Sequence, residues 1–183
     1  MNIRKPTDYT SMFTALDTLM AAQLPQMELY REIGRLVSGR SEKGAAVAAS
    51  EYLQAAYPAA EGFSPRNLRR MRAFYAAYEE SPEIMHLAMR LGWTRNVAIL
   101  EGCGSNKERA WYIRAALRFG WKKAKLLESI KTQAWRNSSL DEQVVSCYTG
   151  EKEITQESES DEEDTLCMPR QDLPFVRKSL KSS

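Results

Sequence analysis

Four arginines and one asparagine lie close together in the middle of the chain, a combination suited to binding phosphate groups. They fall in the segment GFSPRNLRRMRAFYAAY, residues 62–78. Ser64 can accept a backbone N–H as a helix N-cap, and Pro65 suits the first helical position, where its missing N–H is harmless. Apolar residues then recur at helical spacing on one face, and the arginines fall opposite that face or at its edge. The predicted nucleic-acid-binding residues are Arg66, Arg69, Arg70 and Arg72, mainly through phosphate contacts, and Asn67, which is expected either to order the turn or to reach a base.

A second group of cations surrounds a turn that contains Gly120. The segment AALRFGWKKAKLLESI, residues 115–130, has a small residue, a turn glycine and an apolar residue at the spacing of a helix-turn-helix. Many helical hairpins that bind nothing share this pattern. Lysines at the start of the second helix oppose its dipole, and a phosphate there would relieve the conflict. This second predicted set is Lys107, Arg114, Arg118, Lys122, Lys123 and Lys125.

The residues needed for catalysis or metal binding are not apparent in the sequence. The chain has one histidine, His86, and three cysteines that lack the spacing of metal ligands. Cys103 has no base near it in the sequence and is expected to be a buried or idle thiol. Gly102 and Gly104 separate predicted helices rather than follow a strand, so they do not form a nucleotide-binding phosphate loop. We expect neither enzyme activity nor a bound metal or cofactor.

The residue pattern predicts an all-α fold, a compact multi-helix domain that positions both groups of cations. Alternating strand patterns are absent, and good helix formers dominate. Helices 45–57 and 65–78, joined by a turn ending in GFS, form another helix-turn-helix candidate. Gly120 suits a left-handed helix end, and N-cap hydroxyls are expected from Ser64, Ser81, Thr94 and Ser105. The predicted helices cover residues 8–24, 26–37, 45–57, 65–78, 83–91, 95–101, 106–119 and 122–135.

Charge divides the chain into a basic body and an acidic tail. Residues 1–140 hold 21 Lys and Arg and 13 Asp and Glu, a net charge of +8, and are expected to form one domain. Residues 141–183 hold 5 and 11, a net charge of −6, and are expected to be disordered. A basic body favours an anionic partner such as duplex DNA. The alternative is that the cations are only a solvated helix face.

The expected environment is the reducing cytoplasm, without a membrane span. No run of 18 apolar residues occurs, and the N-terminus lacks the apolar region of a secretory signal. An apolar stripe along the first two helices could pair with a second copy of the chain or with another protein, or it could cover its own domain. That stripe consists of Leu16, Leu19, Met20, Leu24, Met27, Leu29 and Ile33.

Five sequence blocks, in order, resemble the N-terminal domain of the YhcG-like family. They are LYREIGRLV (29–37), GFSPRNLRRMRAFY (62–75), LGWTRNVAIL (91–100), RAWYIRAAL (109–117) and GWKKAKLLESI (120–130). The resemblance implies a winged-helix-like module that binds DNA or another protein. In longer members this module precedes a PD-(D/E)XK nuclease domain, and the family is associated with bacterial DNA processing and defence.

Departures from the family pattern limit what the resemblance implies. The chain has no strand run to carry nuclease carboxylates around a metal, so nuclease activity is not transferred. Lys122 stands where the family usually has Ser or Thr, and Arg95 stands where it often has His. The leading hypothesis is therefore a non-catalytic DNA-binding module that assists a nuclease. The alternative is a protein-interaction or regulatory subunit, whose acidic tail masks the basic face or imitates DNA.

Overall fold

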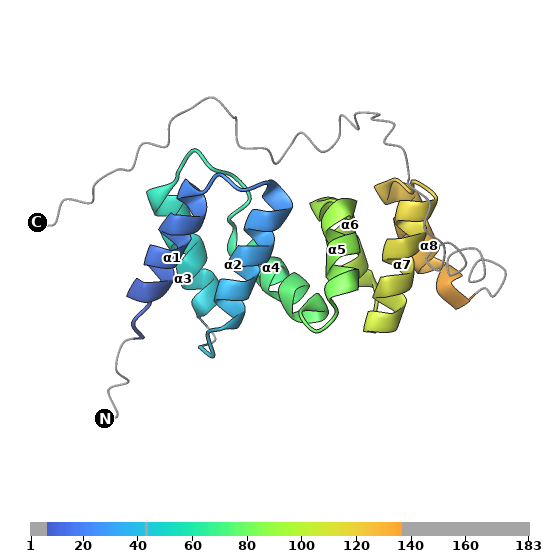
Figure 1. The fold of residues 1–183 in the computed structure, drawn as a ribbon, viewed down its shortest axis with the longest axis horizontal. Coiled ribbons are helices and arrows are strands. Elements are labelled where there is room, and N and C mark those ends of the chain that lie inside the picture. Colours follow the sequence, from blue (N-terminus) through green and yellow to red (C-terminus); the bar gives the residue numbers. More distant parts are fainter. Residues whose placement is uncertain (1–6, 43, 137–183) are drawn as a thin grey trace, which may run out of the picture. The chain divides into compact units, whose positions relative to one another are not determined.

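The computed structural model describes residues 7–42 and 44–136, and these residues form helices without any β-strand (Figure 1). The prediction of an all-α fold is therefore confirmed. The described residues fall into two compact units, a first unit of residues 7–76 and a second unit of residues 77–136. The predicted domain end at residue 140 and the acidic tail lie outside the described residues. None of the described helices is long and apolar enough to cross a lipid bilayer.

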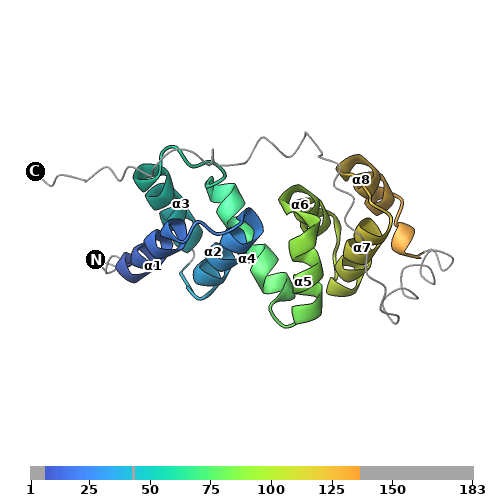
Figure 2. The ribbon, with the colours of Figure 1, turned by 45° about the horizontal axis from the view of Figure 1, so that its top comes forward.

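The first unit contains α1 (Thr10–Ala21), α2 (Gln26–Ser38), α3 (Ala45–Ala56) and most of α4 (Pro65–Tyr78). Helices α1, α2 and α3 pack against one another in pairs, and Figure 2 shows them side by side. The first helix was predicted to reach Leu24, but it ends at Ala21 because Gln23 has a positive φ of 49°. Each helix contributes buried apolar residues, among them Leu16, Ile33, Leu53 and Met71.

A close crossing of α2 and α4 organises the first unit. A Cβ atom at Gly34 would collide with the main-chain carbonyl oxygen of Met71, so only glycine allows the two helices to approach this closely. The Ser38 hydroxyl also donates to the Arg72 carbonyl at 3.5 Å. On the other side of α4, the Ser50 hydroxyl donates to the Phe63 carbonyl at 2.5 Å. These contacts fix where α4 begins and which face it turns inward.

The second unit contains α5 (Pro82–Leu91), α6 (Trp93–Gly102), α7 (Asn106–Arg118), α8 (Lys123–Lys131) and the 3-10 helix η1 (Ala134–Arg136). Helix α5 packs on α7, and α8 packs on both α6 and α7. The fully buried Tyr112 links α7 to α8, because its hydroxyl donates to the Ser129 carbonyl at 3.0 Å. Asn96, also fully buried, donates to the Ala88 and Gly92 carbonyls and so joins α5 to α6.

The predicted helix ends were confirmed where the signal is local. Ser105 accepts the Glu108 N–H at 3.2 Å, and Gly120 has a φ of +60°. The prediction of Thr94 as an N-cap was wrong, because Thr94 lies inside α6. This helix begins at Trp93, directly after Gly92 turns the chain with a φ of +82°. Ser81 precedes α5 as predicted, but its side chain makes no capping bond.

Candidate nucleic-acid interface

The first group of predicted cations lies on α4, whose beginning follows the sequence prediction. Ser64 Oγ accepts the Asn67 N–H at 3.3 Å, and Pro65 is the first helical residue. Leu68, Met71 and Phe74 are fully buried and hold the helix on the first unit. Among the arginines, Arg66 and Arg69 are exposed, whereas Arg70 and Arg72 are half-buried.

No carboxylate interrupts this basic helix. The chain has no Asp or Glu between Glu61 and Glu79, so α4 carries four positive charges and no negative one. The exposed Arg69 has no carboxylate within 4.0 Å among the residues that the structure describes. Its guanidinium group therefore keeps its hydrogen-bond donors available for an external anion.

Asn67 orders the turn that precedes α4, which is one of the two roles predicted for it. Its Nδ2 donates to the Gly62 carbonyl at 2.6 Å, and Gly62 has a φ of +86°. The side chain is half-buried and orders the turn that precedes α4. Of the two roles considered for Asn67, ordering the turn is the one that the described contacts contain.

The second group of cations gathers on α7, on α8 and on the turn between them. The connection between α7 and α8 covers residues 119–122, which is the length of a helix-turn-helix turn. The connection between α3 and α4, the other helix-turn-helix candidate, covers residues 57–64 and is longer than such a turn. The turn is fixed from two sides. Trp121 N–H donates to the Ala116 carbonyl at 3.0 Å, as in a Schellman helix end, and Arg95 Nη1 donates to the Trp121 carbonyl at 3.5 Å.

The predicted cations of α7, α8 and the turn between them are mostly exposed, but Lys107 stands apart at the start of α7, next to Glu108. No Asp or Glu occurs between Glu108 and Glu128. Lys125 pairs with Glu128 at 3.0 Å, which reduces what it can offer to a ligand. Arg114 is half-buried, and the exposed members of the predicted set are Lys107, Arg118, Lys122, Lys123 and Lys125.

The beginning of α8 adds to this positive charge. Its N-cap residue is Lys122, whose side chain cannot accept a hydrogen bond, and the first helical bond runs from the Leu126 N–H to the Lys122 carbonyl. The unpaired N–H groups of the first turn and the positive end of the helix dipole therefore lie at the same place as the charges of Lys122 and Lys123. An anion bound at this end of α8 would be stabilised by both.

An exposed aromatic pair lies within the same turn, and sequence reasoning missed it. Phe119 is 37% exposed, and its ring stacks on Trp121 with centroids 5.7 Å apart and planes 25° apart. Trp121 is half-buried and lies 6.2 Å from the buried Trp111. Trp93 and Trp111, in contrast, are buried in the core. The signal that could have identified Phe119 is its position beside a helix-ending glycine, where no following turn covers it.

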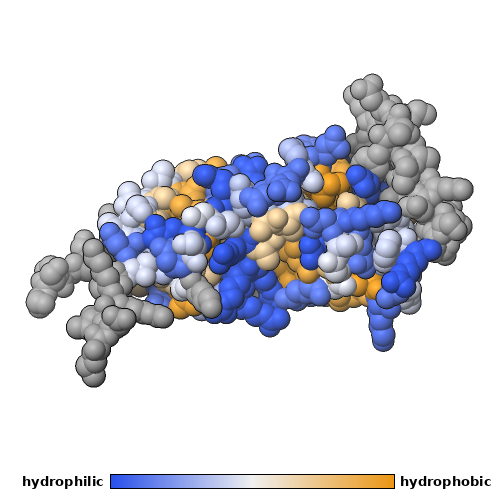
Figure 3. Space-filling model, turned by 90° about the horizontal axis from the view of Figure 1, so that it is seen from below, coloured by the Kyte–Doolittle hydropathy of each residue, from blue (hydrophilic) through white to orange (hydrophobic). Residues whose placement is uncertain are grey.

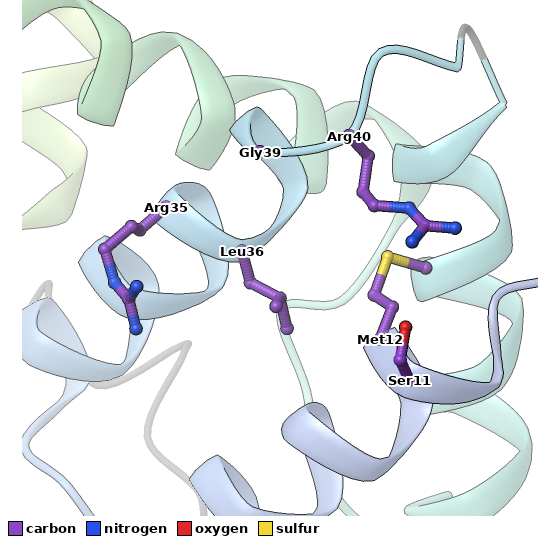
Figure 4. A pocket seen from close by; sticks show the side chains of 6 residues that line it. All are labelled: Ser11, Met12, Arg35, Leu36, Gly39 and Arg40. Atoms are coloured by element: carbon purple, nitrogen blue, oxygen red, sulfur yellow. The ribbon is translucent and has the colours of Figure 1, made fainter.

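The other groups in the described residues that could do chemistry are either engaged or buried. An open pocket of about 320 Å³ lies in the first unit, lined by Ser11, Met12, Arg35, Leu36, Gly39 and Arg40 (Figure 4). Its two guanidinium groups are already engaged, because Arg35 pairs with Glu32 at 2.8 Å and Arg40 donates to the Asp8 carbonyl. Within residues 7–42 and 44–136, no group of three potential metal ligands occurs. Cys103 is buried, and burial raises its pKa to about 12, so its thiol is not a nucleophile at neutral pH.

The apolar stripe of the first two helices is largely used within the first unit. Leu16, Met20 and Ile33 are buried, and the other four members of the stripe are half-buried. Large exposed hydrophobic residues in the described part of the chain are Phe119 and Leu127, both in the second unit. On the face drawn in Figure 3, hydrophilic residues predominate, and hydrophobic ones show between them in small groups. Self-association through this stripe stays a prediction.

A comparison with protein families decides the relationship of the chain. The model of the DUF1016 N-terminal domain matches residues 15–137, more than half of the sequence. The chain belongs to the DUF1016 N-terminal domain family. The YhcG-like family carries this domain, so the resemblance drawn from the five sequence blocks is confirmed. A DUF1016 N-terminal domain has no assigned function, and no catalytic domain is detected in the chain. No curated protein and no solved structure matches it.

Proposed function

We propose that this DUF1016 N-terminal domain is a non-catalytic module that binds duplex DNA through its phosphate backbone. One observation carries the proposal: both units contain a helical segment with several cations and no carboxylate. Residues 62–78 contain four Arg and Lys residues, and residues 109–127 contain six. Such a segment binds a polyanion such as DNA and releases the small cations condensed on that DNA. This release of counterions is the main source of sequence-independent DNA affinity.

The geometry of each segment supports phosphate contacts rather than the reading of bases. Arg66 and Arg69 are exposed on a helix whose opposite face is buried. The guanidinium group of Arg69 can take two oxygens of one phosphate, and Arg66 adds its charge beside it. Arg118, Lys122 and Lys123 surround a turn at the positive end of α8, where a phosphate would neutralise converging charges. Contacts of this kind position a protein on DNA without specifying a sequence.

The partner of such a module would supply the chemistry. Longer YhcG-like proteins join this domain to a nuclease domain, which suggests that the domain brings a nuclease to DNA. We propose the same role for this chain, as an accessory to a nuclease or another DNA-processing protein of bacteria. DNA binding can be tested on the chain alone, independently of that partner.

The test compares two charge-removing variants of the full chain with a matched control. Arg66→Ala/Arg69→Ala removes two exposed cations from α4, and Arg118→Ala/Lys123→Ala removes two from the turn of the second unit. The control, Arg90→Ala/Lys131→Ala, removes two exposed cations from the last turns of α5 and α8. Binding to a blunt duplex is measured by fluorescence anisotropy over a salt series.

Each site variant is expected to weaken binding and to reduce the slope of log affinity against log salt by about two, because each lost phosphate contact releases about one counterion fewer. The control should keep a slope within about half a unit of the unchanged chain. Equal losses in all three variants would mean that net charge alone attracts DNA, and the two sites would be withdrawn. No binding by the unchanged chain near physiological salt would overturn the proposed function.

A further inference from the structure

We propose that the turn between α7 and α8 binds an unpaired nucleotide, whose base stacks on Phe119 while its phosphates contact Arg118 and Lys123. This inference rests on the proposed function and narrows its substrate class. DNA with single-stranded extensions, gaps or frayed ends would then be preferred over blunt duplex.

Phe119 is held in place although it is exposed. It is the C-cap of α7, and its N–H donates to the Ala115 carbonyl at 2.9 Å. Its ring stacks on Trp121, which in turn neighbours the buried Trp111. The bonds from Trp121 N–H to Ala116 and from Arg95 to the Trp121 carbonyl fix the residue behind the exposed ring. A base would therefore meet a pre-ordered aromatic surface and need not order it on binding.

The surroundings of the Phe119 ring favour an anionic aromatic ligand. Exposed apolar side chains commonly mark protein-binding surfaces, but here the flanking residues in sequence are Arg118 on one side and Lys122 and Lys123 on the other. No carboxylate lies between residues 108 and 128. A flat ring next to fixed cations matches a nucleotide, which has a π-face and a phosphate a few ångströms apart.

Only an unpaired base can stack on the Phe119 ring. In a duplex the faces of the bases are covered by their neighbours, so the ring would contact only sugar and phosphate. At a frayed end, in a gap or in a single strand the base face is free, and stacking on an aromatic side chain adds affinity that is independent of sequence. The same turn then contributes charge to every DNA and stacking only to unpaired DNA.

The experiment measures the affinity of the full chain for three probes that share one labelled strand. They are a blunt duplex, the same duplex with a ten-nucleotide single-stranded thymidine extension, and the single strand alone. The unchanged chain is expected to bind the extended duplex about five-fold or more tighter than the blunt one. Phe119→Leu keeps an apolar side chain but loses the aromatic face, and it should abolish this preference while leaving blunt-duplex binding unchanged.

Two control variants separate stacking from general apolar contact. Phe119→Tyr keeps the ring and should bind the extended duplex as the unchanged chain does. Leu127→Ala removes an exposed apolar side chain of α8, the other large one among the described residues, and should also leave the preference unchanged. Circular dichroism of each variant establishes that the helices are retained.

A crosslinking measurement on the unchanged chain does not depend on how the variants fold. A single strand that contains 5-iodouracil is bound and irradiated, and the chain is digested with trypsin. Cleavage after Arg118 and Lys122 releases residues 119–122 as a separate peptide, Phe-Gly-Trp-Lys. The crosslinked base should be found on this peptide, and crosslinks confined to other peptides would overturn the inference.

The outcomes distinguish this inference from the proposed function. Salt-dependent binding with equal affinity for blunt and extended duplexes, unaffected by Phe119→Leu, would overturn the stacking site and leave duplex binding intact. Absence of binding to all three probes would overturn both. If Leu127→Ala abolished the preference as fully as Phe119→Leu, the surface would be an apolar docking site, and stacking would be rejected.

Discussion

The stability of the second unit is expected to fall at alkaline pH, because three of its buried side chains can lose a proton. Cys103 is 4% exposed, and burial raises its pKa from 9.0 to about 12. Burial likewise raises the pKa of Tyr78 and of Tyr112. The folded state thus keeps these groups neutral at a pH at which the unfolded chain releases their protons. Since the unfolded state then binds fewer protons, the free energy of unfolding must decrease as pH rises above about 9.

Replacing Cys103 isolates one part of this effect. Between pH 8 and pH 10.5 the unchanged chain should lose about 2 kcal/mol more stability than Cys103→Ala, since one pKa unit corresponds to about 1.4 kcal/mol. Urea unfolding of both proteins at several pH values measures the difference. The lost sulfur shifts the stability of the variant by an amount that does not vary with pH, so only the slopes are compared. Parallel profiles would show that Cys103 ionises as easily in the folded chain as in the unfolded one.

At the scale of helices, the same substitution at two glycines of the first unit is predicted to have a large effect on stability at one and a small effect at the other. Gly34 lies where α2 crosses α4, and an added Cβ would collide with the Met71 carbonyl oxygen. Gly39 follows α2 with a φ of −66°, and its Cβ would meet no atom closer than 3.7 Å. Gly34 is thus required for the packing of two helices, whereas Gly39 has a backbone conformation that any residue adopts.

Gly34→Ala should therefore destabilise the chain by about 2 kcal/mol or more, because backbone rather than a flexible side chain must move. Gly39→Ala should change stability by less than about 0.5 kcal/mol, since alanine also reduces the freedom of the unfolded chain. Thermal unfolding followed by circular dichroism measures both. A tolerated Gly34→Ala would mean that α2 and α4 can separate, and the orientation of the basic face of α4 would then lose its support.

At the scale of the whole molecule, the balance between basic body and acidic tail is the property most open to experiment. Deleting residues 150–183 removes nine carboxylates and five cations and raises the net charge from +2 to +6. If the tail competes with DNA for the cations, deletion should tighten duplex binding several-fold at low salt, and the difference should shrink as salt increases.

A full-length control separates charge from length. Changing the six carboxylates of ESESDEED, residues 157–164, to their amides keeps every residue in place and removes six negative charges. It should bind DNA at least as tightly as the deleted chain. Equal affinity of all three proteins for duplex would argue against masking in cis. It would favour a tail that serves a partner protein, which loss of a partner complex on deletion would test.

Local signals in the sequence were sufficient for most helix ends. Ser64, Ser105 and Gly120 act within one turn of their own helix, so their neighbours in sequence determine what they do. Thr94 failed as a cap because Gly92 had already turned the chain and α6 began at Trp93. Competition between two nearby start signals depends on how α6 packs, which no local pattern contains.

The sequence by itself determined the helical fold class, the family and the segregation of cations from carboxylates, since composition, spacing and charge are properties of the chain alone. Only the tertiary structure decided which of those cations are exposed. It also decided that Asn67 donates a hydrogen bond to the Gly62 carbonyl, and that Phe119 stacks on Trp121 while remaining exposed. The physical reason is that exposure and contact depend on residues distant in sequence. The bond from Arg95 to the turn at Trp121 spans 26 positions, and the approach of Gly34 to Met71 joins two different helices.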